Sequence, residues 1–104
     1  MNRGDVYRIR LPDGRGHEQR GPRYAVIVQA DALLGLSTAL VAPTSRSAAA
    51  ATFRPEVHVA GAATRVLVEQ LRAVELDRLD RHAGRLTAEE QRAVDAALEL
   101  VVAL

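Results

Sequence analysis

The chain has 104 residues, 48% of them hydrophobic and 26% charged, which suits one domain with a single core and argues against a large multidomain enzyme, a disordered chain and a membrane protein. It contains no cysteine and no lysine, which excludes disulfides, cysteine-ligated metals and lysine Schiff bases. The net charge of +1 hides an asymmetry, because residues 1–54 hold eight arginines and four acidic residues, whereas residues 55–104 hold six arginines and nine acidic residues. This pattern is as typical of a local polyanion site as of ordinary surface charge.

Two apolar patterns near the N-terminus predict strands that flank a long loop. Asp5–Leu11 alternates between two faces, as a strand with one wetter face does. Tyr24–Gln29 is a continuous apolar run, which is typical of a strand buried on both faces. Between them, Pro12–Pro22 holds three glycines, two prolines and no apolar anchor, so we expect a long, mobile loop.

The middle of the chain predicts further short strands. Thr38–Ala42 is a second apolar run that should pair with the preceding one, and Pro43–Ser47 should leave it through a polar turn. The segment Ala48–Ala51 fits helix or loop, since its composition favours the first and its neighbours the second. Glu56–Val59 and Arg65–Arg72 are expected to be strands, the latter presenting Glu and Gln on opposite faces.

From residue 87 the apolar period becomes helical. Thr87 can cap a helix together with Glu90, and the apolar residues that follow recur at helical spacing: Val94, Ala97, Leu98, Val101 and Val102. Short strands followed by one helix describe a mainly β fold, a small bent sheet or partial barrel with the helix packed on it. The apolar end Leu100–Leu104 would gain from burial, so we expect a dimer or a bound protein, with fraying as the alternative.

The available chemistry is that of arginine, acidic, hydroxyl, tyrosine and histidine side chains. No catalytic or phosphate-loop motif has a recognised spacing, and three scattered histidines leave little for a metal, so we expect no metal and no cofactor. Arg23 opens one expected strand and Thr44 with Ser45 ends its neighbour, so antiparallel pairing would bring them together. A guanidinium beside a hydroxyl suits phosphate binding and RNA cleavage by the substrate's own 2′-OH, whereas a solvated charge is the alternative for Arg23.

A group of motifs extends along nearly the whole chain. They are Arg3–Tyr7, Gly16–Val28, Ala42–Ser45, Val66–Glu75 and Asp77–Leu79, followed by the expected helix. In this order they resemble the MazF/PemK family of toxin–antitoxin ribonucleases, and the most specific part is Gly-x-Glu-Gln followed by Arg and an apolar strand. The family often has Arg-Pro at the start of the second strand, whereas here Arg23 follows Pro22 and precedes Tyr24.

The resemblance implies a homodimeric, SH3-like barrel of the CcdB/MazF type, with about five to seven strands in a single domain over residues 1–104. It implies a metal-independent endoribonuclease of the mRNA interferase type, which cuts single-stranded RNA at short sequences, leaves 2′,3′-cyclic phosphate and 5′-hydroxyl ends, and is inhibited by a cognate antitoxin. Carried over by motif, Arg23 and Thr44 are the catalytic pair. Because guanidinium does not readily lose its proton, we assign Arg23 to transition-state stabilisation and Thr44 to holding a phosphate oxygen.

The loop and its borders supply the expected RNA contacts: Arg15, His17, Glu18, Gln19, Arg20, Tyr24 and Ser45. Arg15 and Arg20 would track the RNA backbone or remain solvated. Tyr24 would stack on a base or serve as a core tyrosine with its hydroxyl at the surface, and His17 would be an acid or base or a plain surface residue.

Residues outside this set are interpreted as structural. Glu69 and Gln70 lie either near the RNA groove or dimer face, as the family resemblance suggests, or form a sheet-edge pair bonded to backbone, and we favour the structural interpretation. His58 and His82 are interpreted as structural as well.

Two other functions use the same fold. A CcdB-like protein would bind and poison a DNA topoisomerase instead of cutting RNA, and an inactive member would only bind antitoxin or RNA. The Gly-x-Glu-Gln loop with Arg23 and Thr44 favours the nuclease. No apolar run approaches the roughly 20 residues of a membrane span, and no secretory signal follows Met1, so we expect a cytoplasmic protein without a membrane contact.

Overall fold

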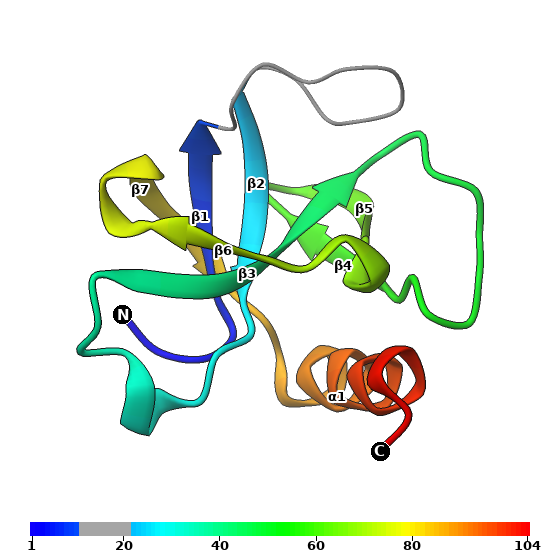
Figure 1. Ribbon diagram of the computed structural model, residues 1–104. Coiled ribbons are helices and arrows are strands. Elements are labelled where there is room, and N and C mark those ends of the chain that lie inside the picture. The colour runs from blue at the N-terminus through cyan, green and yellow to red at the C-terminus, as the bar shows by residue number, and fades with distance from the viewer. Residues whose placement is uncertain (11–21) are drawn as a thin grey trace.

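The computed structural model describes residues 1–10 and 22–104, in which a curled sheet of seven strands is followed by one helix (Figure 1). The elements are β1 (Asp5–Arg10), β2 (Pro22–Ile27), β3 (Thr38–Ser45), β4 (Glu56–Val59), β5 (Ala62–Val66), β6 (Arg72–Glu75), β7 (Leu79–Arg85) and α1 (Ala88–Val102). This architecture confirms the predicted mainly β fold with a C-terminal helix. Residues 12–21 of the expected loop lie outside the described residues.

All strand pairs are antiparallel, and β3 is at their centre. The sheet order is β4-β5-β3-β2-β1-β7, and β6 also pairs with β3. The first half of β3 pairs with β6, its middle with β2, and its last residues, Thr44 and Ser45, with β5. One strand therefore joins the β2-β1-β7 side of the sheet to the β4–β5 hairpin.

Two hydrophobic clusters use opposite faces of β2. Val26 belongs to a cluster that includes Val94 of α1, whereas Ala25 and Ile27 belong to a second cluster with Ile9 of β1. The buried side chains of β2 thus alternate between the two clusters. This confirms the prediction of a strand buried on both faces. The packing on both faces holds β2, and with it Arg23, in place.

The helix begins as the sequence predicts. Thr87 Oγ1 accepts the Glu90 backbone N–H at 3.1 Å, and Glu90 Oε1 accepts the Thr87 N–H at 2.9 Å. Val94 and Ala97 are buried against the first cluster, while Val102, expected on the same apolar face, is 49% exposed. No helix in the described residues is long and apolar enough to cross a membrane.

The prediction of one strand over Arg65–Arg72 is wrong. The segment instead contains the end of β5, a 3₁₀ turn at Val68–Gln70 and the start of β6. Val66, Leu67 and Val68 are all buried, which an alternating strand with one open face does not allow. β5 and β6 pair with successive parts of one edge of β3, at Thr44–Ser45 and Thr38–Val41, and the turn connects them. The Leu67 N–H donates to the Pro43 carbonyl at 2.8 Å.

The end of β3 and the presence of β7 also differ from the sequence prediction. Pro43–Ser45 continues β3 where a polar turn is expected, because pairing with β5 satisfies the backbone of Thr44 and Ser45. β7 has no counterpart among the predicted strands, since it is a mostly exposed strand at the sheet edge without an apolar alternation. Ala48–Ala51 contains neither helix nor strand, so of the two alternatives the loop is correct.

A buried carboxylate ties the chain start to the last strand. Asp5 is 6% exposed and accepts hydrogen bonds from the Asn2 backbone N–H at 2.7 Å and from Arg85 Nη1 at 3.0 Å. His82 Nε2 lies 3.4 Å from the same carboxylate, and its ring packs edge-on against Tyr7. Burial raises the pKa of Asp5, but the hydrogen bonds from Asn2, Arg85 and His82 outweigh it and hold the pKa below its ordinary value.

Asp5→Asn should therefore destabilise the protein in a pH-dependent way. A lowered folded-state pKa contributes stability that is present above the ordinary value of 3.8 and is lost as pH falls through the folded-state value. We expect the variant to lose about 1–2 kcal/mol of unfolding free energy at pH 7, with the difference from wild type shrinking toward pH 3. Urea unfolding at pH 7, 5 and 3 measures this, and a difference independent of pH would contradict it.

Candidate functional site

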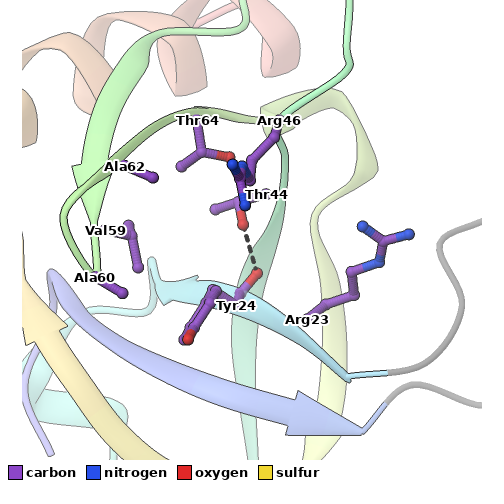
Figure 2. A pocket seen from close by; sticks show the side chains of 8 residues that line it. All are labelled: Arg23, Tyr24, Thr44, Arg46, Val59, Ala60, Ala62 and Thr64. Carbon is purple, nitrogen blue, oxygen red and sulfur yellow. Dashed lines mark hydrogen bonds between the residues drawn. The ribbon is translucent and has the colours of Figure 1, made fainter.

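A pocket opens where the start of β2, the end of β3 and the β4–β5 hairpin meet (Figure 2). Its volume is about 360 Å³, at the lower end of the range for small-ligand sites. The residues that line it are Arg23, Tyr24, Thr44, Arg46, Val59, Ala60, Ala62 and Thr64. The lining thus combines two guanidinium groups and two threonine hydroxyls with a tyrosine and four apolar residues, a composition that suits an anionic ligand.

The structure brings Arg23 and Thr44 to the same pocket. β2 and β3 pair Ala25 with Pro43, so the next step along the register sets Tyr24 beside Thr44. The buried Thr44 hydroxyl donates to the Tyr24 carbonyl oxygen at 3.0 Å. Figure 2 shows the half-buried Arg23 side chain extending from the start of β2, with its guanidinium turned away from that hydroxyl. The strand-end argument from sequence thus predicts the correct pair of neighbouring positions.

Tyr24 has a core contact and a pocket contact at once. Its half-buried side chain packs against the first hydrophobic cluster, as expected for a core tyrosine, and it also lines the pocket.

Ser45 is placed differently from its neighbour Thr44. Successive residues of a strand point to opposite faces, and the buried Ser45 is not among the pocket residues. Its hydroxyl instead accepts the Ser47 N–H at 3.3 Å. The other expected RNA contacts, Arg15, His17, Glu18, Gln19 and Arg20, lie outside the described residues.

Two pocket residues, Arg46 and Thr64, are absent from the sequence-based candidates. The β3–β5 register pairs Thr44 with Val66 and Ser45 with Arg65. Arg46 follows directly after β3 and Thr64 directly precedes Arg65 on β5, which brings both to the pocket. The only sequence signal was the polar run at the end of β3, which was interpreted as a turn. Thr64 lies in an alanine-rich segment and gave no signal.

An ion pair anchors the chain that follows β3. Arg54 Nε and Nη2 donate to Glu69 Oε2 at 2.9 and 2.6 Å, and the Arg54 carbonyl accepts from Arg65 Nη1 at 3.0 Å. The hydrogen bonds from Arg54 raise its pKa above the ordinary arginine value. The structural interpretation of Glu69 is therefore supported, although its partner is a side chain and not the backbone.

The fold and the pocket define a small barrel-like protein with arginine and threonine side chains at one pocket, and similar proteins share this architecture. Residues 2–102 match the family described as PemK-like, MazF-like toxin of type II toxin-antitoxin system. A putative toxin of Mycobacterium tuberculosis is 51% identical over 73 residues, which cover 69% of this chain and 68% of that protein. Endoribonuclease MazF9 of the same organism is 31% identical over 112 residues, covering 96% of this chain and 94% of that protein.

Solved structures show the same fold. MazF from Deinococcus radiodurans superposes with a TM-score of 0.85 at 20% identity, covering 100% of this chain and 97% of that one. An endoribonuclease from mycobacterial species in complex with its cognate antitoxin gives 0.84 at 18% identity, covering 100% and 96%. The chain therefore belongs to the PemK-like, MazF-like family of toxins of type II toxin–antitoxin systems.

Thr44→Val should leave the protein folded. The substitution preserves the side-chain shape and removes the hydrogen bond to the Tyr24 carbonyl, so we expect a loss of about 1 kcal/mol in unfolding free energy. Chemical denaturation followed by circular dichroism measures it, with Thr38→Val, at the other end of β3, as the matched control. A loss beyond about 3 kcal/mol would make Thr44 a structural residue first.

Proposed function

We propose that this toxin is a sequence-specific endoribonuclease that cuts single-stranded RNA through attack of the 2′-OH on the adjacent phosphate, giving 2′,3′-cyclic phosphate and 5′-hydroxyl ends. The observation that carries the proposal is the meeting of Arg23 and Thr44 at one pocket. The family and the endoribonuclease name of the MazF9 relative support it. The reaction needs no enzyme nucleophile, because the substrate supplies its own.

Arg23 stabilises the charge that grows on the phosphoryl oxygens. A guanidinium remains protonated and presents several donors in a fixed plane, which suits a trigonal bipyramidal phosphate better than proton abstraction. Thr44 holds a phosphate oxygen. Its hydroxyl proton is donated to the Tyr24 carbonyl in the unbound protein, so substrate binding exchanges this acceptor for phosphate. A pair of this kind stabilises charge without a metal ion.

The remaining RNA contacts are proposed from the family motif. Arg15 and Arg20 follow the RNA backbone, with His17, Glu18 and Gln19 on the same segment. Tyr24 stacks a base against the face of its ring that borders the pocket. The arginine contacts to phosphate make binding dependent on salt concentration.

A homodimer inhibited by a cognate antitoxin is the assembly that we propose. The helix end exposes Leu100 and Leu104 at 58% and 93%, which favours burial against another chain. A mycobacterial endoribonuclease and MazF of Deinococcus radiodurans have each been solved with an antitoxin, which supports such a partner. An RNA substrate implies action in the cytoplasm.

Arg23→Ala should abolish cleavage without unfolding the protein. We expect a loss of at least about 100-fold in kcat/KM, because the charge that stabilises the transition state is removed. The assay incubates wild type and variant with a long mixed-sequence RNA and with matching single-stranded DNA in EDTA, and it maps the product ends. Cleavage by the variant within about tenfold of wild type would contradict the assignment.

The same experiment separates the alternatives. RNA-only cleavage at a recurring short site, with cyclic phosphate ends, supports the nuclease. Intact RNA from a folded wild-type protein favours a topoisomerase poison or an inactive binding protein. A poison should remain toxic as Arg23→Ala and lose toxicity when the end of α1 is removed.

A further inference from the structure

The β3–β5 side of the pocket contains a second guanidinium and a second hydroxyl. The β3–β5 pairing ends with Ser45 opposite Arg65, and the chain bends at Arg46, the first residue after β3. Thr64 precedes Arg65 on β5, and Arg46 and Thr64 both line the pocket with Thr44. In Figure 2 the Thr64 hydroxyl and the Arg46 guanidinium lie together on this side of the pocket.

The Thr64 hydroxyl is buried and makes no hydrogen bond in the described residues. The residue is 5% exposed, and its Oγ1 is buried without a hydrogen-bond partner within the described part of the chain. Its neighbours on the same face, Val57 and Val66, belong to the hydrophobic core, so a valine would fit this position. A buried hydroxyl without a hydrogen-bond partner lowers the stability of the fold, so a hydroxyl at this position is favoured over a valine only when a ligand accepts its hydrogen bond.

Arg46 supplies the matching charge. It is exposed, and among residues 1–10 and 22–104 it forms no ion pair or hydrogen bond. An exposed arginine at the rim of a pocket can turn onto an anion that the neighbouring hydroxyl also contacts.

We propose, as an extension of the proposed nuclease function, that Arg46 and Thr64 bind a second phosphate of the RNA strand, next to the scissile phosphate held by Arg23 and Thr44. The Thr64 hydroxyl and the Arg46 guanidinium each donate to an oxygen of this phosphate. Because this phosphate does not react, its contacts are equal in the ground state and the transition state and act on affinity. Two phosphate positions also fix the direction in which the strand crosses the pocket.

The test measures binding of a fluorescent, short 2′-O-methyl RNA of randomised sequence, which cannot be cleaved through a 2′-OH. The variants are Thr64→Val, Arg46→Gln and their combination, and Thr38→Val is the matched control outside the pocket. Titrations by fluorescence anisotropy at several salt concentrations give the affinity and its salt slope.

We expect Thr64→Val to weaken binding about tenfold with an unchanged salt slope, because it removes a neutral donor to a charged group. Arg46→Gln should weaken binding and lower the slope of log K against log salt by about 0.7, the value for one phosphate contact on a single strand. The double variant should lose less than the product of the two single losses, because both side chains act on one phosphate. Thr38→Val should bind as wild type does.

Two further readouts separate this role from a structural one. Thr64→Val should have an unchanged or higher melting temperature, since the buried unsatisfied hydroxyl is removed. With cleavable RNA it should raise KM and leave kcat within about twofold.

If Thr64→Val binds the oligonucleotide as tightly as the wild type does, the second phosphate site is wrong, even if the wild type cleaves RNA. The site is also wrong if the wild type does not bind the oligonucleotide. Binding with the expected variant losses but without cleavage of unmodified RNA would instead retain the phosphate site and contradict the nuclease.

Discussion

The pocket depends on the way β3 divides its backbone hydrogen bonds among three strands. Its first half pairs with β6, its middle with β2 and its end with β5. Thr44 lies where the last two of these partners meet: its backbone pairs with β5, and its side chain donates to a carbonyl of β2. One residue therefore holds β2, which contains Arg23, against β5, which contains Thr64. A slip of β3 by one residue would turn Thr44 out of the pocket and Ser45 into it.

Burial makes the hydroxyls of this pocket more useful to an anion than surface hydroxyls. Thr44 and Thr64 are 4% and 5% exposed and adjoin the core cluster that contains Val57 and Val66. In such surroundings a hydrogen bond to a charged oxygen is less screened than in water, and little solvent has to be displaced to form it. The same surroundings make an unused donor costly, so the unbound protein sacrifices stability at the site. Outside the pocket, the buried Oε1 of Glu69 is an acceptor without a hydrogen-bond partner in the described residues.

Local patterns predict the elements whose environment is uniform along their length. β2 and α1 were predictable because an unbroken apolar run and a capped helical period each reflect one kind of burial. The prediction for the segment after Arg65 failed because three consecutive residues, Val66 to Val68, are buried where the chain leaves β5 and rejoins the same edge of β3 as β6. The sequence did not predict β7, because a mostly exposed edge strand has no apolar period. Strand-end reasoning placed Arg23 and Thr44 together, but Arg46 and Thr64 meet only through the β3–β5 register, which no local pattern encodes.

The fold pairs some of the charges of the basic first half with the acidic second half and leaves others at the pocket. Arg3 and Arg54, from the basic half, form ion pairs with Asp95 and Glu69, from the acidic half, at 2.7 and 2.6 Å. At the start of β3, Glu75 pairs with Thr38 and Asp77 follows in the next turn, and both line a small pocket with Arg10 and Arg78. Six residues of extended strand separate Thr38 from Thr44, about 20 Å at roughly 3.4 Å per residue. Acidic and basic side chains thus balance at the Thr38 end of β3, whereas the described residues that line the pocket at the Thr44 end include two arginines and no acidic residue, so a polyanion would be drawn to the Thr44 end. A net charge of +1 therefore does not argue against a nucleic-acid ligand, because the separation of charge along this strand, and not its sum, is what an approaching phosphate backbone meets.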